Sequence, residues 1–383
     1  PPYNETNWIG IINWVANTWF PPRGNIVLAQ LRADLLFPSN SAPNFSQFGG
    51  VVPDGYNLEL SHTNSSGVVL FTIDGSDPRL IGGGGREHAL AWRLAQSPSV
   101  SEVFIGPGNP GVARCAARVR ANNIDQWLSF AKERAIDLTV VGPEAPLVAG
   151  VVDRFRADGL AIVGPTAEAA QLEGSKAFSK DFMIRAGVPT ARYRVVTTLE
   201  EARAALDDFD LPVVLKADGL AAGKGVVIAQ DRAEAEAALP ALLGSSRLVI
   251  EEFLQGEEVS FIVLSDGRKA IPFAPTQDHK NIFDGDKGPN TGGMGAYRDD
   301  RILTPEQSAE VERTVIEPVL ARMAEEGRPF TGFLYAGLMM TPAGVKVLEF
   351  NVRLGDPETQ PLMHGLASDL GEALMASAQG DLG

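Results

Sequence analysis

The stretch at residues 345–361 constrains the fold of this 383-residue chain more than any other, because it joins an alternating strand to a charged loop. It reads VKVLEFNVRLGDPETQP, and its apolar positions Leu348, Phe350, Val352 and Leu354 alternate with Val347, Glu349, Asn351 and Arg353. A period of two places each set on one face of a strand. The polar face offers oxygens for a hard cation and a guanidinium for a phosphate or carboxylate. We predict an ATP-using site here, although an edge strand with a solvated polar face would alternate in the same way.

The segment before this strand predicts its partner. Residues 332–340 are another apolar run, and Thr341-Pro342-Ala343-Gly344 fits a type I turn with Pro at its second position. The two runs should form an antiparallel hairpin. A long amphipathic helix is expected just upstream, at about residues 305–326.

Composition limits the classes of partner. The chain has 33 Lys plus Arg against 48 Asp plus Glu, and the net charge of -15 argues against nucleic acid and against anionic membrane surfaces. No apolar run approaches the roughly 18 residues of a membrane span, and the start shows no secretory leader pattern. The single cysteine, Cys115, excludes an internal disulfide and favours a reducing cytoplasm.

Residues 1–78 differ in kind from the rest of the chain. They contain no Lys, and Arg23 and Arg32 are their only basic residues. We expect a separate or foreign module with a helical piece within residues 13–36 and strands at 55–61 and 67–73. Its end, from Phe71 to Arg79, resembles the β-sandwich module at the C-terminal end of chitobiase-like proteins, and the stretch before it is similar to the tail of CotH-like bacterial surface proteins.

Residues 80–172 alternate short apolar strands with helices, which predicts a parallel sheet covered on both faces. Strands are expected at 80–81, 102–105, 138–141 and 161–163. The run Gly82-Gly83-Gly84-Gly85 precedes a helix at 86–96, where backbone N–H groups can approach a phosphate. Dinucleotide binding is excluded because Glu87 stands at the third glycine position of that motif. Turns after Gly106 and Gly142 should lie at the ligand edge of the sheet.

Three further segments fit a nucleotide site. Residues 173–187 predict a helix that begins in Glu173-Gly174-Ser175-Lys176 and ends at Gly187. The segment at 211–229 fails the Walker pattern, because three residues separate Gly219 from Gly223 and Gly225 replaces Ser or Thr. It fits a hairpin lid, with Lys216 solvated while the site is empty. The stretch at 288–296 is expected to be a second glycine-rich loop that surrounds an anion. His279 has no partner at metal-ligand spacing, so zinc is not expected.

The eight residues Arg353-Leu354-Gly355-Asp356-Pro357-Glu358-Thr359-Gln360 match the signature of the phosphoribosylamine-glycine ligases (glycinamide ribonucleotide synthetases), which are ATP-grasp enzymes. The resemblance extends from about Leu80 to the end of the chain. It implies an α/β fold in which residues 79–172 form a Rossmann-like pre-ATP-grasp domain and residues 173–365 form the ATP-grasp domain. The lid subdomain would span about 190–258, and residues 366–383, with a helix at about 369–378, would start a truncated C-terminal part.

The resemblance also implies the roles of individual residues. ATP would be bound by Lys176, Lys216, Gly223, Lys224, Gly225, Glu251, Glu252, Leu254 and Glu258. Substrates would be bound by Gly84, Gly85, Arg86, Glu87, Gly108, Asn109, Glu144, Asp278, His279, Lys280, Thr291, Gly292, Gly293, Met294 and Gly295. Glu349 and Asn351 would hold Mg²⁺ or Mn²⁺, while Arg353, Asp356 and Lys216 would act in catalysis.

The implied activity is the ligation of glycine to 5-phosphoribosylamine through glycyl phosphate, in purine biosynthesis, by a cytoplasmic monomer. Two alternatives stay open, namely another ATP-grasp carboxylate-amine ligase and a non-catalytic ATP-binding fragment. Because family members continue beyond the position of Gly383, we expect this chain to bind ATP well and to ligate poorly.

Overall fold

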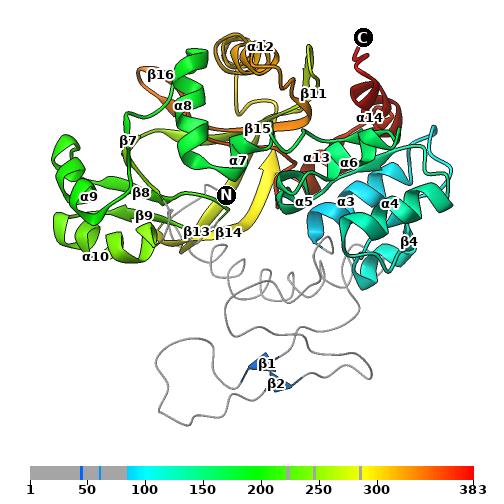
Figure 1. The fold of residues 1–383 in the computed structure, drawn as a ribbon, viewed down its shortest axis with the longest axis horizontal. Coiled ribbons are helices and arrows are strands. Elements are labelled where there is room, and N and C mark those ends of the chain that lie inside the picture. Colours follow the sequence, from blue (N-terminus) through cyan, green and yellow to red (C-terminus); the bar gives the residue numbers. More distant parts are fainter. Residues whose placement is uncertain (1–43, 46–59, 62–83, 221–224, 245–246, 284–286) are drawn as a thin grey trace, which may run out of the picture. The chain divides into compact units, whose positions relative to one another are not determined.

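The computed structural model describes residues 44–45, 60–61, 84–220, 225–244, 247–283 and 287–383 (Figure 1). The chain divides into two units, residues 1–78 and 79–383. In the first unit, β1 (Asn44–Phe45) pairs antiparallel with β2 (Leu60–Ser61). The helices expected within 13–36 and the strand expected at 67–73 lie outside the described residues.

The N-terminal part of the second unit contains two parallel strand pairs with helices around them. Its elements are α3 (Gly85–Leu94), β3 (Phe104–Ile105), a 3-10 turn (Pro110–Arg114), β4 (Ala117–Arg118), α4 (Ile124–Glu133), β5 (Thr139–Val140), α5 (Glu144–Val148), α6 (Val151–Ala157) and β6 (Ile162–Val163). β3 pairs with β4 and β5 pairs with β6, both in parallel. The strands predicted near 104, 139 and 162 are confirmed, whereas the strand at 80–81 lies outside the described residues.

A four-stranded antiparallel sheet with two helices occupies the region where the lid is expected, and we call it the lid sheet. It follows α7 (Gln171–Gly174) and α8 (Lys176–Ala186) and has the order β7 (Tyr193–Val196), β10 (Leu248–Glu252), β8 (Val213–Ala217), β9 (Val226–Ala229), with α9 (Leu199–Ala205) and α10 (Arg232–Leu243) packed on it (Figure 1). The predicted hairpin is confirmed, since β8 and β9 pair from Val213–Ala229 to Lys216–Val226. The predicted end of α8 is confirmed too, because Gly187 caps the helix with a φ of 69°.

The large sheet of six strands carries most of the site. Its strands are β11 (Glu257–Asp266), β12 (Ala270–Pro272), β13 (Thr276–Phe283), β14 (Lys287–Arg298), β15 (Thr331–Thr341) and β16 (Gly344–Asn351), in the order β14-β13-β11-β15-β16 with β12 beside β11. The predicted β15–β16 hairpin is confirmed. The glycine loop expected at 288–296 is wrong: those residues belong to β14, which pairs antiparallel with β13. The pairing is irregular here: His279 pairs with Gly295 and Asn281 pairs with Asn290, so residues 291–294 have no partner on β13. Gly293, one of these four residues, has a φ of 116°.

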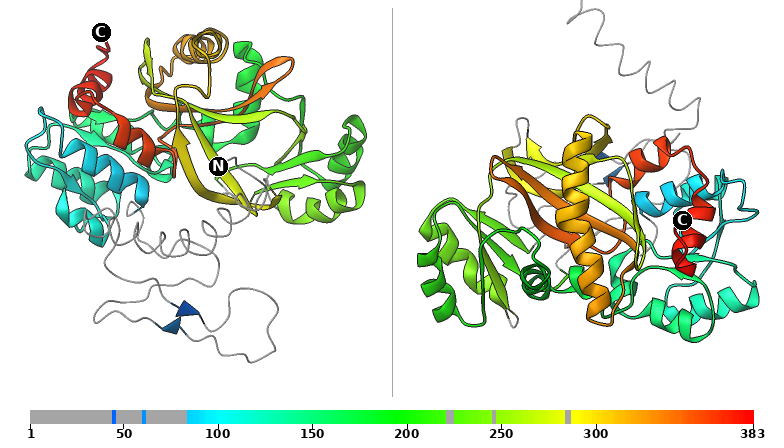
Figure 2. Two further views of the ribbon diagram at one scale, coloured as in Figure 1. Left: turned by 180° about the vertical axis from the view of Figure 1, so that it is seen from behind. Right: turned by 90° about the horizontal axis from the view of Figure 1, so that it is seen from above.

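One continuous helical rod crosses the outer face of this sheet (Figure 2, right). It consists of α11 (Pro305–Val311), a π-helical turn (Glu312–Ile316) and α12 (Glu317–Glu325), which confirms the helix predicted at 305–326. The π-helical turn ends two residues before Pro318. Proline has no N–H to donate, and its ring would clash with a carbonyl one turn earlier in a regular α-helix, so a wider turn accommodates it. Val311, Val315 and Val319 of the rod join the core beneath it.

A β-bulge in β16 changes the predicted alternation. Gly337 of β15 pairs with Glu349 and the next residue, Leu338, pairs with Val347, so that Leu348 has no partner. The extra residue lets Val347 (0% exposed) and Phe350 (2% exposed) enter the same core. Our assignment of Leu348 to the apolar face and Val347 to the polar face is therefore wrong, because a bulge shifts the phase of a strand by one residue.

Two C-terminal helices close this part of the fold. α13 (Thr359–Gly365) and α14 (Leu370–Gln379) share an apolar core with α3 and β15, and Ser377 of α14 donates to the Ser265 carbonyl at 2.6 Å. The helix predicted at 369–378 is confirmed within one residue, with Asp369 as its N-cap. None of the helices in the described ranges is long and apolar enough to span a membrane.

Candidate functional site

A buried ion cluster joins α8 to the lid sheet. Glu251 of β10 is 2% exposed, and its Oε2 lies 3.0 Å from Lys180 Nζ and 3.2 Å from Lys216 Nζ. Lys180 also donates to Thr190 Oγ1 at 2.7 Å. Glu251 Oε1 is buried and accepts no hydrogen bond from the protein. Glu251 Oε1 is therefore an unused acceptor on β10, the strand that the resemblance assigned to adenine recognition.

Lys216 is not solvated, contrary to our expectation. It is only 8% exposed, because its ammonium donates to the Leu348 carbonyl at 3.3 Å as well as contacting Glu251. The bulge supplies this acceptor, since Leu348 is the residue without a strand partner. Next to it, Thr190 Oγ1 donates to the Val347 carbonyl at 2.7 Å. The bulged segment of β16 thus receives hydrogen bonds from the lid strand and from the loop after α8.

Glu349 stands among positive charges. Burial by itself would raise the pKa of this carboxyl, but Lys216, Lys280, Lys176 and Arg353 together hold it below the usual value. Glu349 is therefore ionised at neutral pH. Three of these cations also pair with other carboxylates: Lys216 with Glu251, Lys280 with Glu258, and Arg353 with Glu173 and Glu144. The surroundings of Glu349 are therefore a network of paired charges, whose cations can also face an anionic ligand such as a polyphosphate.

The base of the lid hairpin is tied to the start of α8. Asp218 Oδ1 accepts hydrogen bonds from Ser175 Oγ (2.9 Å) and from the Ala177 N–H (3.2 Å), while Arg247 Nη2 lies 2.8 Å from Asp218 Oδ2. Lys176 Nζ donates to the Gly219 carbonyl at 2.9 Å. The lysine predicted to reach the nucleotide therefore lies where the start of α8 meets the β8–β9 hairpin. Gly225 closes the hairpin by accepting from the Ala217 N–H at 2.8 Å, whereas Gly223 and Lys224 lie outside the described residues.

Arg353, just after β16, connects this strand to two other elements. Its guanidinium contacts Glu173 Oε1 at 2.8 Å and Glu144 Oε2 at 3.3 Å, and it donates to Asn351 Oδ1 at 3.2 Å. Glu173 Oε2 in turn accepts from the Val352 N–H at 2.8 Å. Burial opposes the charge on Arg353, but the two glutamates outweigh burial and raise the pKa of the guanidinium.

The N-terminus of α3 meets the signature loop. Arg86 donates to Glu87 Oε1 at 2.7 Å and to the Leu354 carbonyl at 3.1 Å. Small residues make this approach possible: a Cβ on Gly84 would lie 3.4 Å from Asp356 Oδ2, and a Cβ on Gly85 would lie 2.7 Å from Gln360 Nε2. Asn109 donates to the Gly84 carbonyl at 3.4 Å, and Gly108, with a φ of 65°, turns the chain before it. The predicted substrate residues Gly84, Gly85, Arg86, Glu87, Gly108 and Asn109 thus lie together beside Asp356.

The edge strands β13 and β14 bring further polar groups to the site. Lys280 forms a short ion pair with Glu258, the residue assigned to the ribose. Asp278 Oδ1 is buried without a hydrogen-bond partner, and a Cβ on Gly293 would lie 3.1 Å from it. Burial, reinforced by the charge of Glu358, raises the pKa of Asp278 to about 6.

The other predicted residues of these strands take varied positions. His279 stacks on Tyr297 with ring centroids 5.8 Å apart. Thr291, Gly292, Met294 and Gly295 belong to β14, and the side chains of Thr291 and Met294 lie outside the described part. On β10, the carboxylate of Glu252 accepts from Lys346 Nζ at 2.8 Å and from the Arg192 N–H at 3.0 Å, and Leu254 follows as a buried residue.

Among the described residues there is no group of three or more His, Cys, Asp or Glu side chains able to hold a metal ion. Glu349 and Asn351 nevertheless offer a carboxylate and an amide oxygen from one strand face. Mg²⁺ is commonly bound by one or two such protein ligands together with substrate phosphates. The donor set therefore fits a divalent cation that arrives with a nucleotide.

Sequence reasoning missed several participants. Lys180 could have been found, because it lies four residues after Lys176 and so on the same face of one helix. Glu173 and Asp218 gave no comparable signal, because their partners lie 179 and 43 residues away in the chain. The buried trio of Ser260, Tyr335 and Glu358, in which Tyr335 donates to Glu358 Oε1 at 2.6 Å, depends on three separate elements.

Comparisons with known proteins agree with this arrangement. The family model described as phosphoribosylglycinamide synthetase, N domain, matches residues 79–173, and the one described as phosphoribosylglycinamide synthetase, ATP-grasp (A) domain, matches residues 174–359. The chain is 56% identical over 315 residues to the phosphoribosylamine–glycine ligase of Xanthomonas axonopodis, covering 79% of this chain and 73% of that protein. It is 54% identical to the ligase of the same name from Escherichia coli, with the same coverage.

Solved structures give the same result. A phosphoribosylamine–glycine ligase from Thermotoga maritima matches with a TM-score of 0.68 and 34% identity, covering 78% of this chain and 74% of that chain. An N5-carboxyaminoimidazole ribonucleotide synthetase from Thermus thermophilus matches with a TM-score of 0.58 at 20% identity, which shows a shared fold. Neither of the two family models extends into residues 1–78, and the likeness of that segment to surface-protein tails finds no support. On this evidence, the chain belongs to the phosphoribosylglycinamide synthetase family of ATP-grasp enzymes.

Proposed function

We propose that this chain joins glycine to 5-phosphoribosylamine with consumption of ATP, giving glycinamide ribonucleotide, ADP and phosphate. A family match over residues 79–359 and relatives that are 54–56% identical support this function. A carboxylate and an amine do not condense at neutral pH, so the γ-phosphoryl group of ATP is first transferred to the glycine carboxylate. The amine then attacks the carbonyl carbon of glycyl phosphate, the C–O bond to phosphate breaks, and the amine nitrogen loses a proton.

The nucleotide would lie between the lid and the large sheet. Lys176 and Lys216, together with Gly223, Lys224 and Gly225 of the lid hairpin, are the groups that we assign to the phosphates. Phosphoryl transfer requires mainly positioning and charge neutralisation, and lysines with glycine-rich backbone supply both. We assign adenine and ribose to Glu251, Glu252, Leu254 and Glu258. The unused acceptor at Glu251 Oε1 supports the first of these, because the exocyclic amine of adenine is a donor.

A divalent cation would be held by Glu349 and Asn351. When bound, it neutralises charge that builds up on the phosphoryl oxygens. We propose Mg²⁺ or Mn²⁺, because both accept hard oxygen ligands. The pKa of Glu349, which its cationic neighbours lower, keeps this carboxylate ionised and ready to bind a cation.

The two substrates would meet at the signature loop. We assign the glycine carboxylate to Arg353 and the glycine ammonium to Asp356, with Glu144 orienting Arg353. Phosphoribosylamine is assigned to the α3 side, Gly84 to Glu87 with Gly108 and Asn109, and to Asp278, His279, Lys280 and residues 291–295. The contact of Arg86 with the Leu354 carbonyl supports this, because it links the two substrate sides directly.

We also propose the organisation of the chain. Residues 79–172 would bind phosphoribosylamine, residues 173–365 would bind ATP, with a lid at about 190–258, and residues 366–383 would begin a C-terminal part. The single free cysteine, Cys115, supports a reducing cytoplasm. We further propose a monomer. Residues 1–78 have no role in this proposal.

The observation that carries the proposal is the buried carboxylate of Glu349, whose pKa the charges of Lys216, Lys280, Lys176 and Arg353 hold below its usual value. The test replaces Glu349 by Gln, with Glu325→Gln on the exposed end of α12 as the matched control. We expect Glu349→Gln to abolish ADP release at ordinary Mg²⁺ concentrations, because the new amide and Asn351 offer two neutral oxygens and no negative charge to the cation, while the control keeps full activity. Turnover that survives Glu349→Gln would place the cation elsewhere.

A further inference from the structure

Glu173, at the end of α7, joins the turn between α7 and α8 to the segment that follows β16. Its Oε1 lies 2.8 Å from Arg353 Nη2, and its Oε2 accepts a hydrogen bond from the Val352 N–H at 2.8 Å. One carboxylate therefore holds both the guanidinium and the backbone of that segment. The roles proposed above for the site residues do not include Glu173.

Two ion pairs hold Arg353, and the one with Glu173 is the shorter and the more buried. The side chain of Glu173 is 8% exposed, whereas that of Glu144 is 29% exposed and its Oε2 lies 3.3 Å from Arg353 Nε. Water and salt screen a buried pair less than an exposed pair. Glu173 therefore contributes more than Glu144 to the placement of the guanidinium.

These two contacts decide where the rest of the guanidinium points. The group is planar and rigid, so contacts of Glu144 at Nε and of Glu173 at Nη2 fix the direction of Nη1. Nη1 has two N–H groups and donates one of them to the Leu354 carbonyl at 3.3 Å. Within the ranges that the structure describes, the other N–H of Arg353 Nη1 is available to a substrate carboxylate.

The stretch that begins with Glu173 also contacts the β8–β9 hairpin. Ser175, the N-cap of α8, donates to Asp218 Oδ1 at 2.9 Å, and Lys176 donates to the Gly219 carbonyl at 2.9 Å. Glu173 precedes these two residues by two and three positions. One short piece of chain therefore contacts Arg353 on one side and carries a lysine assigned to the ATP phosphates on the other.

We infer that Glu173 is a positioning residue, which holds Arg353 so that the bound glycine carboxylate meets the γ-phosphate of ATP. The inference rests on the proposed function, because that proposal assigns the glycine carboxylate to Arg353 and the phosphates to Lys176. Glu173 acts through Arg353 and sets the distance between the two assigned sites. Reacting atoms must lie about 3–3.5 Å apart, and a misplacement of about 1 Å can cost on the order of a hundredfold in rate.

The test replaces Glu173 by Gln, which keeps the shape of the side chain and an acceptor for the Val352 N–H but removes the charge that pairs with Arg353. Calorimetry measures the affinity for glycine in the presence of Mg²⁺ and a nonhydrolysable ATP analogue, and then the affinity for the analogue alone. Burial raises the pKa of Glu173 although Arg353 opposes this rise, so the titrations are made at pH 8. We expect Glu173→Gln to bind glycine at least about tenfold more weakly and the analogue within about twofold of the unmodified chain.

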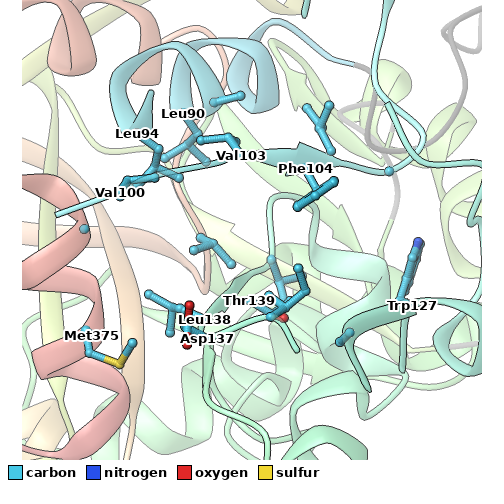
Figure 3. A pocket seen from close by; sticks show the side chains of 18 of the residues that line it. Leu90, Leu94, Val100, Val103, Phe104, Trp127, Asp137, Leu138, Thr139 and Met375 are labelled. Carbon is cyan, nitrogen blue, oxygen red and sulfur yellow. The ribbon is translucent and has the colours of Figure 1, made fainter. Parts of the chain in front are cut away.

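The control is Asp137→Asn, which also exchanges a carboxylate for an amide of the same shape. Asp137 lines a cavity between β3 and β5 (Figure 3), and it precedes β5 whereas Glu144 follows that strand. Both affinities should stay unchanged in this variant. Circular dichroism and melting curves show whether each variant folds.

A second variant, Glu173→Asp, separates positioning from support of the backbone. It keeps the charge but is one methylene shorter, so its glycine affinity should lie between those of the unmodified chain and Glu173→Gln. If Glu173 only supports the Val352 backbone, Glu173→Gln should bind glycine better than Glu173→Asp, and this order would overturn the inference. Equal glycine affinity in Glu173→Gln and the unmodified chain, or parallel losses for glycine and the ATP analogue, would overturn it as well. If the unmodified chain binds the analogue but not glycine, the proposed function fails and the inference fails with it.

Discussion

Replacement of Lys180 by Met tests the buried ion cluster through the pH dependence of stability. Burial lowers the pKa of Lys180 from its ordinary value of 10.5 to about 8, even though Glu251 lies 3.0 Å away. The folded protein therefore loses this proton at a lower pH than the unfolded chain does. Between pH 8 and 10.5 the unfolded chain binds more protons, so the free energy of unfolding rises with pH. At about 1.36 kcal/mol per pH unit, the rise that Lys180 contributes is about 3 kcal/mol.

The assay is urea unfolding at four values of pH between 7.5 and 10.5. We expect the stability difference between the unmodified protein and Lys180→Met to grow by about 3 kcal/mol in favour of the unmodified protein across this range. Lys132→Met is the matched control, because Lys132 is a half-exposed lysine paired with Asp158 at 3.2 Å. The free energy of unfolding of Lys132→Met should change with pH in parallel with that of the unmodified protein. If the free energy of unfolding of Lys180→Met also changes in parallel, the burial of a charged lysine beside Glu251 is refuted.

Three further changes test neighbouring parts of the site. Lys216→Ala should weaken ATP binding at least about tenfold in calorimetry and also lower the melting temperature, because Glu251 and the Leu348 carbonyl lose a donor; unchanged affinity would remove the lysine from the phosphate site. In the unmodified protein, the free energy of unfolding should fall as the pH rises from about 4 to 6, because the folded Asp278 carboxyl, with a pKa of about 6, keeps a proton that the unfolded chain releases. Asp278→Asn should abolish this fall. If the urea midpoints of the variant and of the unmodified protein change equally with pH across that window, the prediction is wrong. Gly142→Ala should impair use of phosphoribosylamine and spare ATP binding, because its Cβ would lie 2.5 Å from Glu87 Oε1; parallel losses in both would argue for general misfolding.

Local patterns predicted most of the elements. The β15–β16 hairpin followed from two apolar runs and one turn, and the end of α8 followed from Gly187. These features depend on residues that are neighbours in the chain, so that the sequence contains the whole cause. The polar face of β16 was also correct from Glu349 onward.

The errors arose where distant segments decide the outcome. The bulge at Leu348 comes from the register with β15, and no local property of Leu348 announces it. Residues 288–296 have the composition of a loop, but β13 pairs with both ends of this stretch, at Asn290 and at Gly295 and Ala296. Lys216 was expected to be solvated, but it is buried against Glu251 and the Leu348 carbonyl. Both partners belong to other strands, so the sequence around Lys216 does not predict its burial. Tertiary pairing overrides local preference in all three cases.

The proposed reaction, in which this site uses ATP to couple glycine to phosphoribosylamine, can be measured directly. The measurement is a coupled assay of ADP release on the full chain with Mg²⁺, in which glycine, freshly made phosphoribosylamine, or both are supplied. We expect slow ADP release, in line with the poor ligation predicted from the sequence, and only when both substrates are present. Acetate or alanine at equal concentration should not replace glycine. ATP binding without substrate-dependent ADP release, or equal turnover with another carboxylic acid, would contradict the proposed reaction.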